Sequence, residues 1–390
     1  MEKYVVLRDV APATHQLTRG AMIGARAISS AKPQLKIEIE SVPAHAVADL
    51  RQDPRVKSAA PIIATRLIKP LSSQATFTGD AWGIAAVRAD STPYTGDGVT
   101  VAVLDTGIDA AHPAFAGVDL NQQDFSGTGN HDANGHGTHC AGTIFGRDVN
   151  GQRIGIARGV KKALIGKVLD DDGGGSSEMI FQALQWALRE RADIISMSLG
   201  FDFPGTVQRK VDAGWPVDLA TSEALEAYRG NLRMFDALMA MFKAEGAFRG
   251  SPVVIAAAGN ESRRDLRSEY RISASVPAAA DGVISVAAAH QLGEEFGIAD
   301  FSNSLAHISA PGVDILSAWP GGTLHSLNGT SMACPHVAGV AALWWEYAVK
   351  EGAPVTSTAV FSQLTSTARK LFSVQFDRSD FGFGLVTSPA

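Results

Sequence analysis

The stretch VTVAVLD (99–105) is a continuous apolar run that ends in a carboxylate. Helical patterns follow it, such as the segment 176–192, in which Ile180, Leu184 and Leu188 recur at a spacing of four. Apolar runs that alternate with amphipathic helices are typical of a parallel sheet buried on both faces. The sequence therefore predicts an α/β fold with a doubly wound, mostly parallel sheet flanked by helices. The further runs are ALIGKVL (163–169), IISMSLG (194–200), VVIAAAGN (253–260) and VISVAAA (283–289).

Composition limits the classes of partner. The chain has 390 residues, of which 45% are hydrophobic and 19% charged, and its formal net charge is −6. Because it lacks a basic excess, we expect no nucleic-acid partner, and because no apolar stretch has the length of a membrane span, we expect no membrane partner. The N-terminal sequence MEKYVVLRDV has too short an apolar run for a signal peptide. Location stays open: secreted if a signal peptide has been removed, otherwise cytoplasmic.

The sequence predicts two domains with a boundary near residue 75. Residues 1–75 predict a small α+β domain, with strands over KYVVL (3–7) and LKIEIE (35–40), a helix over 44–53 and a polar linker over 71–80. Residues 76–390 then form the large α/β domain. A long connection at about 201–252 interrupts it and contains a predicted helix over 217–243.

Three residues follow or open predicted elements where ligands of such a fold bind. Asp105 ends the first strand, His136 lies between glycines in NGHGTHCAG (134–142), and Ser331 precedes an apolar helix in NGTSMACPHVAG (328–339). Taken singly, the aspartate is a turn or helix cap and the serine an N-cap. A metal site at His131, His136 and His139 is a further alternative, but no HExxH pattern supports it, so we expect no metal there.

Taken together, Asp105, His136 and Ser331 stand in one of the known chain orders of a serine triad. The strings AVLDTGIDAAHP, NGHGTHCAGT, AAAGN and NGTSMACPHVAG closely resemble the catalytic motifs of the subtilisin-like serine proteases, the subtilase family. The resemblance covers roughly residues 80–390. It implies a serine endopeptidase that acts on polypeptides without a required cofactor.

The resemblance also implies a role for each residue. Ser331 is the expected nucleophile, His136 the general base and Asp105 the group that orients it, while Asn260 donates to the oxyanion. Substrate is expected to pair as an extended strand with Gly173, Gly174, Gly175, Ser198, Leu199 and Gly200. The small residues Ala257, Ala258 and Gly259 imply a roomy apolar specificity pocket, with Glu261 at its rim to tolerate a basic residue. Tight strand packing is the other explanation for these small residues.

The N-terminal unit resembles, more loosely, the inhibitory propeptide of secreted subtilases. It implies an intramolecular inhibitor and folding aid that covers the cleft through its C-terminal tail and is cut off by the enzyme itself, between about Pro70 and Thr78. A permanent accessory domain is one alternative. Another is a non-catalytic or permanently inhibited subtilase-fold protein that serves binding or regulation.

Two further expectations concern ligands and thiols. Calcium is possible, but the usual ligand pattern is missing, since Ala114 replaces an expected aspartate and the loop 146–155 lacks ligands. Cys140 and Cys334 each lie about one helical turn after a candidate catalytic residue. We expect both to be buried thiols beneath the site that pack as small apolar groups.

Overall fold

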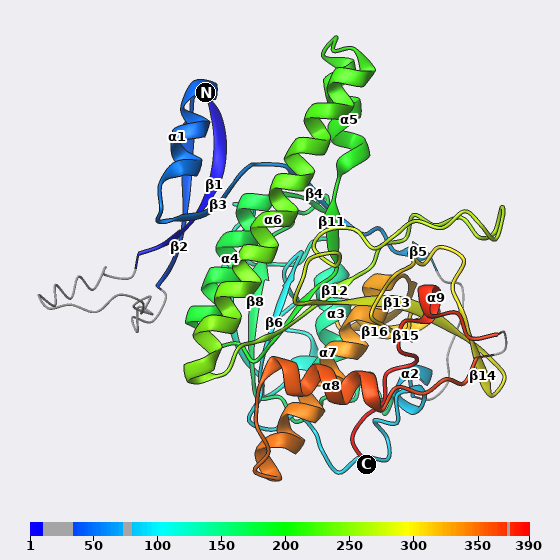
Figure 1. The fold of residues 1–390 in the computed structure, drawn as a ribbon. Helices are drawn as coiled ribbons and strands as arrows, with labels where there is room; N and C mark the ends of the chain where they lie inside the picture. The colour runs from blue at the N-terminus through cyan, green and yellow to red at the C-terminus, as the bar shows by residue number, and fades with distance from the viewer. Residues whose placement is uncertain (11–33, 73–79, 373–374) are drawn as a thin grey trace, which may run out of the picture.

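The computed structural model describes residues 1–10, 34–72, 80–372 and 375–390. Its centre is one large sheet with strand order β14-β13-β12-β10-β6-β8-β7, and β15 pairs with β13 beside this path (Figure 1). All pairings are parallel except that of β13 with β14. The predicted doubly wound α/β fold is confirmed. The strands are β6 (Thr100–Asp105), β7 (Asp119–Asp124), β8 (Lys162–Lys167), β10 (Ile194–Met197), β12 (Val253–Ala257), β13 (Val283–Leu292), β14 (Glu295–Ile298) and β15 (Ile308–Pro311).

Both faces of this sheet are covered, which is why its strands are continuously apolar. In β6, Val101 and Val103 pack in the core that contains α3 (His136–Phe145) and α7 (Thr330–Lys350). The alternate residues Ala102 and Leu104 pack in a second core with α4 (Ser177–Arg189) and α6 (Val217–Arg249). Successive side chains of a strand point to opposite faces, so each face carries its own helix layer.

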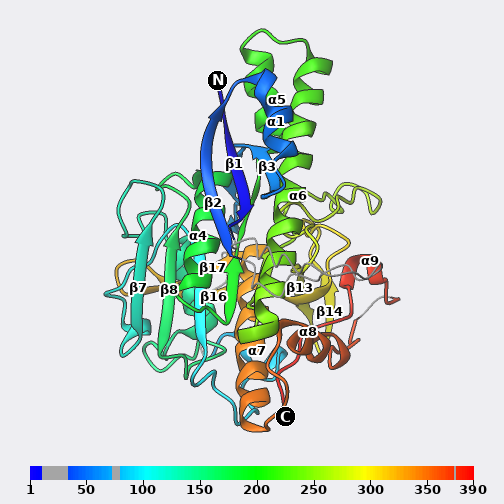
Figure 2. The same ribbon diagram turned by 60° about the vertical axis from the view of Figure 1, so that its left-hand side comes forward.

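The N-terminal unit is a three-stranded antiparallel sheet in the order β2-β1-β3, with η1 (Ala44–Ala46) and α1 (Val47–Gln52). Its strands are β1 (Glu2–Asp9), β2 (Leu35–Val42) and β3 (Val56–Pro61). One face of β1 presents Tyr4 and Val6 to α1, while the other presents Val5 and Leu7 to the core around α4 and α6. The unit therefore lies beside α4 and α6 (Figures 1 and 2) and shares a hydrophobic core with the large domain.

The long connection forms a helical hairpin of α5 (Phe203–Asp212) and α6 that projects past the sheet (Figure 1). The helix predicted over 217–243 exists and continues to Arg249. Among its apolar residues, Phe235 and Leu238 are buried, but Leu225 is 45% exposed because it lies in the projecting half of the helix. The sequence did not predict α5.

Smaller elements complete the described chain. β4 (Ala64–Leu67) lies between β9 (Gly174–Ser176) and β11 (Leu199–Phe201), and β5 (Leu71–Ser72) pairs with β17 (Thr323–Asn328), which also pairs with β16 (Ile315–Trp319). The predicted linker over 71–80 thus begins as a short strand, and residues 73–79 lie outside the described part. The remaining elements are α2 (Trp82–Ala86), η2 (Pro113–Phe115), α8 (Ser357–Ser366) and α9 (Arg378–Phe381).

Candidate active site

Asp105 and His136 form a buried hydrogen-bonded pair. Asp105 is the last residue of β6 and His136 the first of α3, as the sequence predicted for the helix start. The Nδ1–H of His136 donates to Oδ1 of Asp105 at 2.7 Å. A side chain on Gly137 is impossible here, because its Cβ would lie 2.2 Å from the carbonyl oxygen of Gly107. The glycine therefore lets α3 approach the end of β6 closely enough for the pair to form.

Ser331 is the second residue of α7, not its N-cap. Gly329 holds the cap position, so the N-cap explanation of Ser331 is wrong. As a first-turn residue, Ser331 carries a backbone N–H without an acceptor inside the helix. Its hydroxyl donates to the carbonyl oxygen of Ile68 at 3.0 Å, with Ser198 O at 3.4 Å. Nε2 of His136 has no hydrogen-bond partner among the described residues.

Asn260 is held in a fixed orientation by Thr330, the residue before Ser331. Its Oδ1 accepts two hydrogen bonds from Thr330, from the backbone N–H at 2.9 Å and from Oγ1 at 2.8 Å. These donors leave Nδ2 facing the cleft, where it donates to the carbonyl oxygen of Lys69 at 3.1 Å. An amide in this position can stabilise negative charge that develops on a bound carbonyl.

An extended strand of the chain itself occupies the cleft. β4 pairs antiparallel with β11, where Arg66 lies opposite Gly200 and Leu67 opposite Leu199. On its other edge β4 pairs with β9, and the N–H of Leu67 donates to Gly173 O at 2.8 Å. The two segments that were predicted to bind substrate therefore flank one extended strand, β4. They are Gly173, Gly174, Gly175 on one edge and Ser198, Leu199, Gly200 on the other.

The resemblance to a propeptide implied that the tail of the N-terminal unit covers the cleft, but it did not specify residues 64–69. The run VKSAAPIIATRLI (56–68) has the composition of an extended segment. The partners of residues 64–67 lie more than a hundred residues away, and no local pattern specifies such a pairing. Pro70 after Lys69 was the available signal, since proline at the end of an extended run marks the limit of strand pairing.

The side chain of Ile68 is buried beside the cleft floor. It is 3% exposed and belongs to the same apolar core as Ala257, and its Cγ1 lies 3.5 Å from the position that a Cβ on Gly200 would take. Gly259 has φ +116°, and a Cβ there would lie 2.2 Å from Nδ2 of Asn303, so only glycine fits. Ala258 packs elsewhere, against Ala287 and Ala306. Glu261, expected at the rim, forms an ion pair with Arg66 at 3.5 Å.

Residues 96–385 match the model of the subtilase family. The chain belongs to this family. It is 36% identical over 272 residues to "Subtilisin-like protease 6" of Trichophyton equinum, covering 67% of this chain and 57% of that protein. It is 31% identical over 312 residues to "Subtilisin DY" of Bacillus licheniformis, covering 79% of this chain and 97% of that protein. The chain thus spans little more than half the length of the fungal relatives and nearly all of the Bacillus one.

Both thiols of this subtilase lie beneath the site, and their predicted burial is confirmed. Sγ of Cys140 lies 3.4 Å from the carbonyl oxygen of Ser331 and 3.8 Å from Nδ1 of His136. Burial raises the pKa of Cys140 well above its ordinary value and that of Cys334 to about 11. Both sulfurs therefore remain protonated at neutral pH and pack as apolar groups.

The histidine metal site considered from the sequence does not assemble in the subtilase. His131 is exposed beside Asp171, whereas His139 is buried with Nε2 bonded to Ile315 O and His325 O, and burial lowers its pKa to about 3. Among the described residues, three potential ligands converge only at Asp105, His136 and Cys140. This group is the hydrogen-bonded pair of Asp105 and His136 together with the protonated thiol of Cys140. Ala114 is buried in η2, and the calcium expectation remains a prediction.

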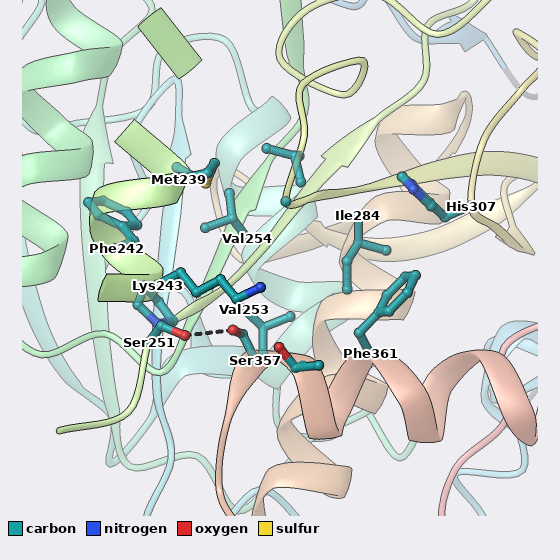
Figure 3. A pocket seen from close by; sticks show the side chains of 14 residues that line it. Met239, Phe242, Lys243, Ser251, Val253, Val254, Ile284, His307, Ser357 and Phe361 are labelled. Atoms are coloured by element: carbon teal, nitrogen blue, oxygen red, sulfur yellow. Dashed lines mark hydrogen bonds between the residues drawn. The ribbon is translucent and has the colours of Figure 1, made fainter. Parts of the chain in front are cut away.

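A separate cavity of about 210 Å³ lies at the N-terminal ends of two strands of the large sheet (Figure 3). Its walls come from the starts of β12 and β13 and from α6 and α8, with Lys243 reaching over it and a 2.6 Å hydrogen bond between Ser251 and Ser357. The candidate residues instead follow the carboxyl ends of the strands. This cavity is therefore not the candidate site.

No described helix of the subtilase meets the length and hydropathy that a membrane crossing requires.

Proposed function

We propose that this subtilase is a serine endopeptidase that hydrolyses extended polypeptides through an acyl-enzyme, and that it is made as a self-processing zymogen. One observation carries the proposal: a strand of the chain's own N-terminal region lies in the cleft, with the carbonyl oxygen of Ile68 3.0 Å from Oγ of Ser331. In this proposal residues 1–68 are the inhibitory domain and Ile68–Lys69 is the bond that is cut.

The register of β4 supports this bond. Backbone groups of one residue point to the same side of an antiparallel strand and alternate along it. Leu67 bonds to Gly173, so Arg66 and Ile68 direct their N–H and C=O groups to the β11 side, where Ser198 and Ser331 lie. The neighbouring bond Lys69–Pro70 is less suitable, because the side chain of Lys69 is exposed whereas that of Ile68 is buried. The proposed position lies just before the range of 70–78 expected from the sequence, and residues 73–78 of that range lie outside the described part.

The proposed chemistry uses the groups already in place. Oγ of Ser331 attacks the carbonyl carbon of Ile68 while Nε2 of His136 takes the hydroxyl proton, and Asp105 holds Nδ1–H and stabilises the imidazolium. Nδ2 of Asn260 and the N–H of Ser331 donate to the oxyanion. Collapse of the tetrahedral intermediate breaks the C–N bond between Ile68 and Lys69, and His136 gives the proton to the nitrogen of Lys69. Water then hydrolyses the ester by the same steps.

Two small movements precede attack. The hydroxyl of Ser331 must turn from the Ile68 carbonyl to Nε2 of His136, which has no hydrogen-bond partner in the described part of the chain. The Ile68 carbonyl must turn toward Asn260, whose Nδ2 now holds Lys69 O. The hydrogen bonds of β4 to β9 and β11 keep the backbone in place during this change, which favours an intramolecular reaction.

Docking of the N-terminal unit holds the strand in the cleft. Nδ2 of the buried Asn231 on α6 donates to Pro61 O at 2.8 Å, just before β4 begins. Val5, Leu7 and Ala60 pack in one core with Phe235 of α6. An inhibitor tethered in this way binds at a high effective concentration. The proposed partner of the catalytic domain is therefore its own residues 1–68.

Intact mass analysis of the purified chain tests the proposal. The native chain should lose residues 1–68 and expose Lys69 as a new N-terminus, and its Ser331 should react with a fluorophosphonate. Ser331→Ala should remain full length and unlabelled, whereas the control Ser362→Ala, on the exposed side of α8, should behave as native. If the native chain stays intact and unlabelled, the proposal fails and a non-catalytic, permanently occupied subtilase fold replaces it.

A further inference from the structure

Two carboxylates face the one basic side chain within β4. Nη1 of Arg66 lies 3.2 Å from Oδ1 of Asp202, and Nη2 lies 3.5 Å from Oε1 of Glu261. Asp202 directly follows β11, and Glu261 directly follows Asn260. Both acidic residues therefore border the cleft from different segments of the large domain.

Both carboxylates are held by the protein. The carboxylate of Asp202 is 14% exposed, accepts from Gly205 N at 3.2 Å as the N-cap of α5, and pairs with Arg209 at 3.0 Å. Its own backbone N–H donates to Ala64 O of β4 at 3.1 Å. The site is thus tied both to the insertion helix and to the bound strand.

Glu261 is oriented by a buried amide. Its Oε2 accepts from Nδ2 of Asn303 at 2.8 Å, and its backbone N–H donates to Oδ1 of the same residue at 3.1 Å. The second oxygen, Oε1, is left to point at Arg66. Groups fixed in advance lose little conformational entropy when a ligand arrives, so the arrangement favours recognition of a cation.

The position of Arg66 relative to the proposed cut defines what is recognised. Arg66 is the third residue on the N-terminal side of Ile68–Lys69, opposite Gly200. Its neighbours Thr65 and Leu67 are buried, as is Ile68, whereas Arg66 is half-exposed between the two carboxylates. Among residues 64–68 it is the only charged side chain.

We propose that this cleft selects polypeptide substrates with arginine or lysine at the third residue before the cut bond, and that Asp202 and Glu261 determine this preference. The inference rests on the proposed function and adds a substrate class to it. Arg209 already offsets part of the charge of Asp202, while no other cation pairs with Glu261 among the described residues. Two partly exposed ion pairs correspond to about a 2- to 30-fold preference in kcat/KM.

The test uses the full chain after processing and after the cut N-terminal unit has been separated from it. The substrates are quenched fluorescent peptides with the sequence of residues 64–71. The third residue before the cut is arginine, lysine, norleucine or glutamate. Norleucine keeps an aliphatic stem and removes the charge, so it separates ion pairing from packing. We expect the order arginine and lysine, then norleucine, then glutamate, and a smaller spread at high salt because exposed charges are screened.

Variants locate the preference. Asp202→Asn with Glu261→Gln should bring the arginine-to-norleucine ratio close to one, since both replacements keep oxygen acceptors for Gly205 and Asn303. Asp265→Asn with Glu269→Gln removes the same charge from an exposed loop and should keep the native ratio. Equal rates for the arginine and norleucine peptides with the native chain would overturn the inference even if the Ile–Lys bond is cut. No cleavage of any peptide, with Ser331 unlabelled, would instead overturn the proposed function beneath it.

Discussion

Replacing Ile68 by alanine should slow cleavage of the bond that follows it by a calculable factor. The side chain of Ile68 is 3% exposed, so its carbons have left water almost completely. The change removes three carbons, each of which contributes about 0.8 kcal/mol when buried. The expected loss is about 2.4 kcal/mol, which corresponds to about a 60-fold fall in kcat/KM.

Peptides of residues 64–72 measure this loss directly, with products identified by mass. In the same peptide Lys69→Ala is the matched control, because Lys69 is exposed and its loss should change kcat/KM by less than about threefold. If the Ile68→Ala peptide is cut as fast as the native one, Ile68 does not fill the specificity pocket. A product ending in Lys69 would likewise refute the assigned register.

Three further outcomes are expected. Thr330→Val removes one of the two hydrogen bonds that orient Asn260, so kcat should fall about tenfold with little change in KM. This fall corresponds to about 1.4 kcal/mol, which is less than the about 2.7–4 kcal/mol that loss of the donor itself costs in subtilisin. Burial raises the pKa of Asp193 to about 6, although Thr100 N–H donates to it. Because this pKa is higher in the folded than in the unfolded chain, ionisation destabilises the fold as pH rises from about 4 to about 6. Asp193→Asn should therefore increase the free energy of unfolding by up to about 3 kcal/mol above pH 7 and by little below pH 4, measured by urea denaturation of Ser331→Ala protein; a gain independent of pH would contradict this. A maleimide should label Cys140 in the folded chain at least about a hundredfold more slowly than in urea, and equal rates would place the thiol outside the core.

The sheet was predictable because burial on both faces leaves a strong local signal. In β6 every residue from Val101 to Leu104 is buried, so the run is apolar without alternation. α5 left no such signal, since its ten residues FPGTVQRKVD bury none of their side chains. Its start is specified by Asp202, whose side chain accepts a hydrogen bond from Gly205 N. In the sequence, an aspartate followed closely by proline and glycine is equally typical of a turn, so it does not by itself predict a helix.

The closeness of Asp105 and His136 was predictable from the sequence, but the residues that lie in the cleft were not. Asp105 and His136 follow strand and helix boundaries that the sequence marks, and the pair forms. The hydrogen bond between Ser331 and Ile68 depends on docking of the N-terminal unit against α6, which joins residues far apart in the chain. Local patterns carry no information about such contacts. The resemblance to a propeptide implied that the tail of the N-terminal unit covers the cleft, but the residues that lie at Ser331 became visible only in three dimensions.

The same contacts that align Ile68 for cleavage also oppose release of the product. After the cut, β4 would still pair with β9 and β11, and Val5 and Leu7 would still share a core with α6. Hydrolysis of one bond removes only the tether to Lys69 and leaves this interface unchanged. Processing and activation are therefore separate steps in the proposed zymogen: the first depends on Ser331, and the second on how readily the N-terminal unit leaves α4 and α6.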